Sequence, residues 1–185
     1  MASAPVSTRR SVGMESCPPK LQRAHDLRPS NPGKKKPPEA VLLSHQPLDH
    51  VLIMLGTNDL KAKFDRNIND ISRAIVNLAE IARSTPAGRG GWFSDQTPNV
   101  SVICPLIIGQ RASDLNWDRF EEWVGAYEKS ILLVDTLKRA CNAVNINMID
   151  GNQFSSSSEL DPIHWNKENH QRFGQKMAKA IQAFL

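Results

Sequence analysis

The chain has 185 residues, of which 40% are hydrophobic and 23% are charged, with 23 Lys and Arg residues against 19 Asp and Glu residues. This composition is typical of a soluble globular protein and excludes a collagen, a wholly disordered chain and a disulfide scaffold. No apolar run approaches the ~18 residues of a bilayer-spanning helix, so we expect no membrane insertion. Three cysteines without metal-ligand spacing favour a reducing, cytoplasmic location.

Positive charge and proline are concentrated in the first fifth of the chain. Residues 1–39 contain eight basic and three acidic residues and seven of the twelve prolines, whereas residues 40–185 contain 15 basic and 16 acidic residues. Such a segment buries too little apolar surface to offset its ordering entropy. We therefore predict a basic, Pro-rich, disordered segment at 1–39 and a folded domain at 40–185.

The basic run Lys34–Lys36 can be interpreted as a solvated tail or as a contact for phosphates or an anionic surface. No aromatic residue lies among these charges, which argues against nucleic-acid binding through base stacking. The first interpretation is the one we adopt, and an interaction protein that uses this tail is kept as an alternative.

The first predicted elements of the domain are a strand and a helix. Residues 50–55 (HVLIML) form a short apolar run before Gly56, and their length and branched side chains predict a strand that is buried on both faces. A helix is predicted over 65–84 from apolar residues at helical spacing, with Asp65 as its N-cap and Pro86 beyond its end.

The same criteria predict four later elements, which are a strand at 100–104, a helix at 119–144, a strand at 146–149 and a helix at 167–185. We expect Asn166 to cap the last helix. Helical spacing assigns an inner face to each helix, made of Phe120, Val124, Tyr127, Ile131, Val134, Leu137 and Cys141 in the first and Phe173, Met177, Ile181 and Phe184 in the second. Cys104 and Cys141 lie in apolar runs and are expected to be buried and inert.

Alternating strands and helices predict an α/β fold, a three-layer, flavodoxin-like parallel sheet with helices on both faces. In such sheets the chemistry lies beyond the carboxyl ends of the strands. Two candidate sites therefore follow the first and the third strand, at Gly56–Asp59 and at Asp161–His164.

The first candidate is the tetrapeptide Gly56-Thr57-Asn58-Asp59. Gly56 allows the backbone to turn sharply, and Asn58 can present a neutral amide donor to a developing oxyanion. The structural alternative is that Asn58 and Asp59 only cap the turn and the next helix.

The second candidate is Asp161-Pro162-Ile163-His164. His164 can take a proton near neutral pH, and a carboxylate three residues earlier can accept its Nδ1–H and leave Nε2 free. The alternative is a loop histidine that is hydrogen-bonded for structural reasons only.

Together, the two motifs resemble the SGNH (GDSL-type) hydrolase family, with its G-x-N-D and D-x-x-H blocks. The sequence from Pro47 to Asp49 and from Ile53 to Lys61 is similar to the arylesterase/acyltransferase branch, and the resemblance covers about 40–185. It implies an ester hydrolase in which His164 is the general base, Asp161 orients it, Asn58 is an oxyanion donor, and Gly56 and Asp59 shape the site. It also implies a small ester substrate or acyl ligand. No cofactor or metal is indicated.

The nucleophile block of that family is not found. No G-D-S occurs in the sequence, so the nucleophile is unknown, and Ser155–Ser158 fit a flexible turn better than a nucleophile position. The family's N-terminal strand is expected to be missing, which leaves strand 50–55 with an open edge for an oligomer or a completing chain. A truncated hydrolase, a pseudoenzyme, and a non-catalytic acyl- or acetyl-binding module with Trp117 at its rim stay open as alternatives.

Overall fold

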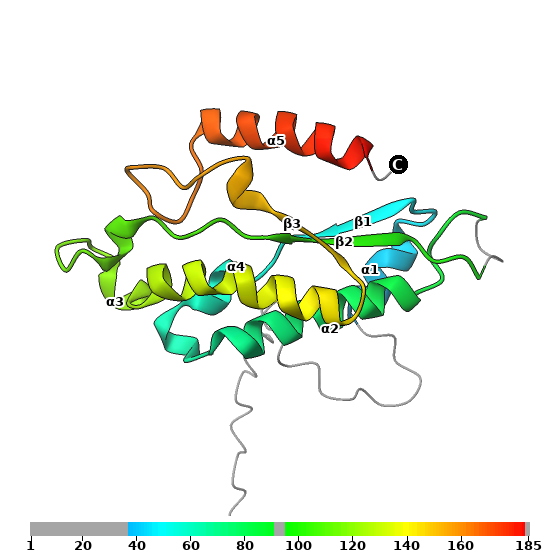
Figure 1. The fold of residues 1–185 in the computed structure, drawn as a ribbon, viewed down its shortest axis with the longest axis horizontal. Coiled ribbons are helices and arrows are strands. Elements are labelled where there is room, and N and C mark those ends of the chain that lie inside the picture. Colours follow the sequence, from blue (N-terminus) through cyan, green and yellow to red (C-terminus); the bar gives the residue numbers. More distant parts are fainter. Residues whose placement is uncertain (1–36, 91–94, 184–185) are drawn as a thin grey trace, which may run out of the picture.

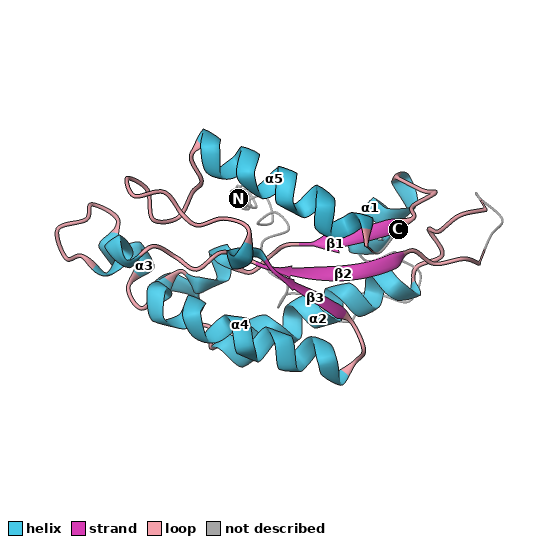
Figure 2. Cartoon of the chain, turned by 45° about the horizontal axis from the view of Figure 1, so that its top comes forward, coloured by secondary structure: helices cyan, strands magenta, loops and turns pink. Residues whose placement is uncertain are grey.

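The computed structural model describes residues 37–90 and 95–183, and the sheet in this part of the chain has three parallel strands. These are β1 (His50–Ile53), β2 (Asn99–Cys104) and β3 (Asn147–Asp150), and β2 lies between the other two (Figure 2). β1 pairs with β2 from His50↔Asn99 onward, and β2 pairs with β3 from Ser101↔Asn147 onward. The predicted parallel sheet is confirmed.

Helices cover both faces of this sheet (Figure 1). On one face, α2 (Ile68–Ser84) and α4 (Ala126–Ala143) pack against the strands in one hydrophobic cluster that includes Ile75, Val102 and Leu137. On the other face, α5 (Lys167–Gln182) contributes Met177 to a cluster with Ile103 and Ile149. The predicted layered α/β architecture is therefore correct.

The first strand is shorter and less buried than its sequence predicts. β1 ends at Ile53, all four of its residues are half-buried, and Leu55 beyond it is 46% exposed. The physical reason is its place at the edge of the described sheet, where β2 is its one partner strand. An apolar run therefore does not distinguish a central strand from an edge strand.

The start of the first long helix also differs from the prediction. α2 begins at Ile68, and the N-cap is Asn67, whose side chain accepts a hydrogen bond from the Asp70 N–H. Asp65 does not cap the helix, because it adopts a left-handed backbone conformation with φ of 43° at the end of a short 3-10 turn. Two such turns, Thr57–Leu60 and Ala62–Phe64, fill the space between β1 and α2.

The helix predicted at 119–144 is divided into α3 (Phe120–Trp123) and α4. Gly125, with φ of 75°, separates them. The buried face of α4 is formed by Ala126, Ser130, Leu133, Thr136, Leu137 and Cys141. The predicted inner positions Val124 and Ile131 are wrong, since these side chains are 45% and 42% exposed. The break at Gly125 ends the helical spacing that joined these positions, and the spacing of apolar residues alone does not reveal such a break.

The ends of the described chain agree with the prediction in part. Asn166 caps α5 as predicted, and Phe173, Met177 and Ile181 face the sheet, while Phe184 lies outside the described residues. α1 (Pro37–Ser44) was not predicted, and it begins three residues before the expected domain start. Its Leu42 packs against Ala82 and Ala87. Residues 1–36, which include the basic run Lys34–Lys36, lie outside the described residues.

Candidate active site

The turn after β1 requires glycine at position 56 for two reasons. Gly56 has φ of 115°, a left-handed conformation that L side chains rarely adopt. A Cβ at this position would lie 3.1 Å from Cδ1 of Ile75 and 3.4 Å from Cγ2 of Ile71. The chain therefore turns tightly over α2 and enters the 3-10 turn Thr57–Leu60.

The two polar residues of this turn have different environments. Asp59 is buried, and its Oδ1 accepts a hydrogen bond from the Arg66 guanidinium at 2.5 Å. Asn58 is half-buried, and within residues 37–90 and 95–183 its carboxamide makes no hydrogen bond, although its backbone oxygen accepts one from Lys61. The ion pair of Asp59 fixes the turn, and the amide of Asn58 stays available as a donor.

The second predicted motif forms a hydrogen-bonded unit. The Nδ1 atom of His164 lies 2.6 Å from Oδ2 of Asp161, and Oδ1 of the same carboxylate accepts the backbone N–H groups of Ile163 at 2.8 Å and His164 at 3.2 Å. A carboxylate at Nδ1 favours the tautomer in which Nδ1 carries the hydrogen and Nε2 has a free lone pair. The His164 side chain is 66% exposed, so Nε2 is accessible to a substrate.

The electrostatics of Asp161 favour its charged form. Partial burial raises the pKa of Asp161. Hydrogen bonds from the His164 ring and from the N–H groups of Ile163 and His164 together lower it by more, so the net pKa lies below the ordinary value of 3.8. Asp161 is therefore ionised at neutral pH and can stabilise an imidazolium at His164.

The serines before this motif hold the loop together. Ser158 Oγ donates to the Asp161 carbonyl and accepts from the Asp161 N–H, both at 2.9 Å. The buried Ser155 hydroxyl donates to the Asn169 carbonyl on α5 at 3.1 Å. Both hydroxyls are thus hydrogen-bonded to backbone groups. They stabilise the loop, which is more constrained than the flexible turn expected from the sequence.

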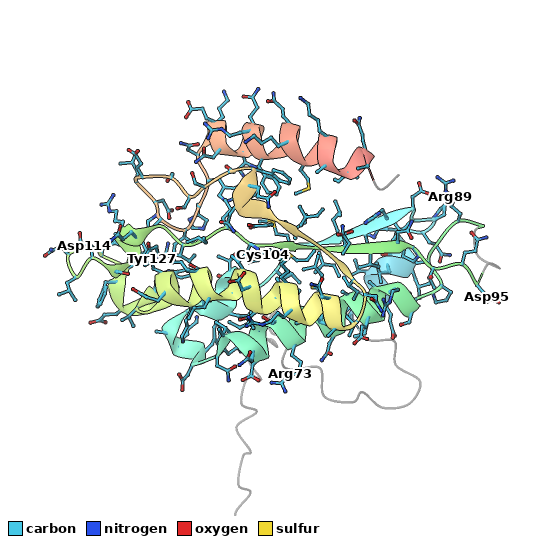
Figure 3. All side chains as sticks on the ribbon, viewed as in Figure 1. Arg73, Arg89, Asp95, Cys104, Asp114 and Tyr127 are labelled. Atoms are coloured by element: carbon cyan, nitrogen blue, oxygen red, sulfur yellow. The ribbon has the colours of Figure 1, made fainter. Side chains whose placement is uncertain are left out.

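The two motifs meet the same loop, which follows β2. Pro105 lies beside Gly56, since a Cβ on Gly56 would be 3.8 Å from its Cγ, and the N–H of Gly109 donates to the Pro162 carbonyl at 2.8 Å. Asn152, after β3, accepts the Ile107 N–H at 2.7 Å. Asp114 marks this end of the molecule in Figure 3, opposite the end with Arg89 and Asp95. Both motifs therefore lie at the carboxyl edge of the sheet.

Sequence reasoning missed the residues that join these loops. Gly109 is tightly enclosed, because a Cβ there would lie 2.8 Å from Ser157 Oγ and 3.0 Å from Pro162 Cα. The available signal was an isolated glycine after an apolar run, which can mark a close backbone approach. Asn152 gave no comparable signal, since its partner lies 45 residues away.

Two other expectations concern the surroundings of the site. Trp117 is only 8% exposed and packs in the main core, so its predicted place at a ligand rim is wrong. Cys104 and Cys141 are fully buried as predicted, and burial raises the pKa of their thiols to about 12 and about 11, respectively. Thiols with such pKa values are poor nucleophiles.

Across 37–90 and 95–183, no group of three or more His, Cys, Asp and Glu side chains is arranged to hold a metal ion. None of the helices described combines the length and the apolar character that crossing a membrane requires.

No family model matches this chain, and no curated protein matches its sequence. Solved structures do match its fold. A carbohydrate acetylesterase from Sinorhizobium meliloti is 28% identical with a TM-score of 0.70, and an aryl esterase from M. smegmatis, in an inhibitor-bound form, is 26% identical with a TM-score of 0.70. Each match covers 80% of this chain and 66% of the other, so the chain spans just under two thirds of the length of these esterases.

A more distant structure supports the fold alone. A member of the lipolytic G-D-S-L family from Veillonella parvula is 15% identical with a TM-score of 0.54, and the match covers 78% of this chain and 70% of that protein. The structural neighbours of this chain thus include two esterases and a member of the lipolytic G-D-S-L family, and the chain has their α/β fold.

Proposed function

We propose that this chain carries the base and oxyanion part of an SGNH-type carboxylic-ester hydrolase. The observation that carries the proposal is the 2.6 Å hydrogen bond between His164 Nδ1 and Asp161. It lies at the same edge of the sheet as the Asn58 amide, which makes no hydrogen bond to any of the described residues. His164 is the general base, Asp161 orients it, and Asn58 donates to the oxyanion.

The proton in this reaction moves through Nε2 of His164. As the oxygen of a hydroxyl group bonds to the ester carbonyl carbon, its proton passes to Nε2, and the negative charge that develops on the carbonyl oxygen is stabilised by the Asn58 amide. Collapse of the tetrahedral intermediate breaks the bond between the carbonyl carbon and the leaving oxygen. The leaving alkoxide accepts the proton that Nε2 received from the attacking hydroxyl group. The imidazolium formed between these steps is stabilised by ionised Asp161.

The hydroxyl group is the open part of the proposal. The sequence contains no G-D-S, and the hydroxyls of Ser155 and Ser158 are bonded to backbone. Within the described residues, we propose a water molecule activated by His164 as the nucleophile. We expect turnover several orders of magnitude below that of a complete Ser-His-Asp site, because the nucleophile of that site is not available. Oxyanion stabilisation and substrate binding should still give a rate ~10³–10⁴-fold above that of the uncatalysed reaction.

The direct test is hydrolysis of p-nitrophenyl acetate by the purified chain and by His164→Ala. We expect a measurable rate in the wild type that falls to the background rate in the variant. Equal rates in both proteins would exclude His164 as a base.

A second candidate function is a non-catalytic acyl- or acetyl-binding module, which the absence of a G-D-S block favours. Asn58 and His164 would then hydrogen-bond the acyl group without activating a nucleophile. Calorimetry with acetate would give binding without turnover, and binding that survives in Asn58→Ala would count against this function.

The organisation of the protein is part of the same proposal. Residues 40–185 act as the folded domain, and the edge of β1 is open to pairing with a strand from a second copy or another chain. The support is that β1 has β2 as its one partner strand in the described part of the chain. We place the protein in the reducing cytoplasm, on the basis that Cys104 and Cys141 are free thiols.

A further inference from the structure

Lys61 directly follows the turn that carries Asn58, and it is tied to that turn by its backbone. Its N–H donates to the Asn58 carbonyl at 3.3 Å. Its side chain is 17% exposed and reaches across to α3, where Nζ lies 2.7 Å from Oε1 of Glu122. One residue therefore links the backbone of Asn58 to a separate element.

On α3, the Glu122 carboxylate is also paired with a second cation, Arg119. Oε2 of Glu122 accepts Nε and Nη2 of Arg119 at 3.0 and 2.9 Å, so both carboxylate oxygens are occupied by cations. Lys61 Nζ also lies 5.0 Å from the ring centroid of Trp123, which is 1% exposed. A cation over the face of a buried indole adds to the attraction of the ion pair.

The charges match the geometry. The hydrogen bond from Lys61 lowers the pKa of Glu122, partial burial opposes this shift, and Arg119 lowers the pKa further, to about 2. Glu122 is therefore ionised over the whole range in which a His base can operate.

Neither α3 nor the turn Thr57–Leu60 is long enough to be stable through its own helical hydrogen bonds. α3 has only four residues, and the turn Thr57–Leu60 is a single 3-10 turn, so both depend on tertiary contacts for their position. On its other side the turn is held by the 2.5 Å pair of Asp59 with Arg66. The amide of Asn58 has no hydrogen bond of its own in the described residues, so no side-chain partner holds it, and the position of its backbone determines the region that the amide can reach.

We propose that Lys61 and Glu122 are positioning residues for the Asn58 amide, acting through the ion pair between the Asn58 turn and α3. The significance for catalysis rests on the proposed function, because a displacement of about 1 Å at an oxyanion donor is enough to reduce a rate by about 100-fold. The positioning itself is a property of the folded chain and can be measured without turnover.

The experiment is amide hydrogen exchange and NMR of the Asn58 side-chain NH₂ group in the full chain. In Glu122→Gln we expect the Lys61 amide to exchange about tenfold faster than in the wild type, because a hydrogen-bonded charge pair is lost. The Asn58 NH₂ signals should shift in Glu122→Gln and in Lys61→Met. Lys61→Arg, which keeps the charge, should restore the wild-type signals.

Glu80→Gln is the matched control. It makes the same chemical change at a carboxylate on α2 that is paired with Arg83 at 3.9 Å. Within the described residues, no hydrogen bond or ion pair joins Glu80 to the Asn58 turn. Equal exchange at Lys61 in Glu122→Gln and Glu80→Gln, or unchanged Asn58 signals in Lys61→Met, would overturn the positioning role. Lys61→Met provides this result independently if Glu122→Gln does not fold.

An ester assay on the same proteins separates this proposal from the proposed function. If the wild type hydrolyses p-nitrophenyl acetate, positioning predicts a lower kcat with a nearly unchanged KM in Lys61→Met. If the wild type shows no turnover, the esterase proposal fails, while the exchange and NMR results still decide whether Lys61 and Glu122 position Asn58.

Discussion

Asp161 illustrates how much of the candidate site depends on single side chains. One carboxylate accepts three hydrogen bonds, from the His164 ring and from two backbone N–H groups, and so holds both the imidazole and its own turn. The D-x-x-H spacing allowed this contact to be predicted, because a turn of four residues brings its first and last side chains together. The Asn58 turn was less predictable, since the pairing of Asp59 with Arg66 depends on how the following turns fold.

The lowered pKa of Asp161 makes a prediction about stability and pH. A carboxyl group with a depressed folded-state pKa stabilises the fold above its unfolded-state pKa, and this contribution is lost as pH falls through the folded-state value. Asp161→Asn should therefore destabilise the protein near neutral pH, and the difference from the wild type should shrink progressively below about pH 4. Urea denaturation at a series of pH values measures this difference.

Ser158→Ala provides the control for that experiment, because it removes two hydrogen bonds of the same turn without removing a titratable group. Its destabilisation should not show the same decline below pH 4. A penalty for Asp161→Asn that stays constant from pH 7 to pH 3 would contradict the assigned electrostatics.

At the scale of elements, the sequence predicted the order and type of the main strands and helices but not their exact limits. Asn166 was recognised as a cap because it directly precedes a run of apolar residues at helical spacing, whereas Asp65 was wrongly chosen over Asn67. Both residue types cap helices well, and the choice between them depends on the 3-10 turn before α2. Such a turn is fixed by tertiary contacts and leaves little pattern in the sequence.

The face that α4 buries is a further case, and it leads to a second prediction. Leu137 is fully buried between α4 and its neighbours, while Ile131 on the same helix is 42% exposed. We expect Leu137→Ala to cost about 2–5 kcal/mol of unfolding free energy, because it leaves a cavity in the main core. Ile131→Ala should cost less than about 1 kcal/mol, since little apolar area is lost from the interior.

Urea denaturation of the two variants measures both losses of unfolding free energy. A shift of the denaturation midpoint counts as a change in stability only if the m-values of the variants are equal. Both residues were assigned to the inner face from apolar spacing. Similar losses in the two variants would mean that α4 is rotated toward that original prediction, in disagreement with the structure.

At the scale of the whole molecule, the candidate site is built where three loops leave the same edge of a parallel sheet. The sequence predicted this edge, because strands connected by helices must run parallel and end together. It did not predict how the loops are joined, since the contacts of Gly109 with Pro162 and of Ile107 with Asn152 link residues about 50 positions apart. Residues 37–90 and 95–183 thus bring the loops that carry His164, Asp161 and Asn58 to one edge of the sheet.

The two buried cysteines report on whether the fold opens as one unit. Cys104 on β2, labelled near the centre of Figure 3, and Cys141 on α4 are both fully buried in the cluster that joins the sheet to α2 and α4. Burial raises their pKa values to about 12 and about 11, so little of the reactive thiolate form is present in the folded protein.

In a Cys17→Ser background, we expect both thiols to react with a disulfide reagent at the rate of global unfolding under native conditions, and within seconds in denaturant. Gln175→Cys, at an exposed position on α5, should react at once under native conditions and so verify the reagent. Fast native labelling of Cys104 or Cys141 would mean that the core between the sheet and α4 opens locally, and the rigid carboxyl edge on which the proposed chemistry depends would then not exist.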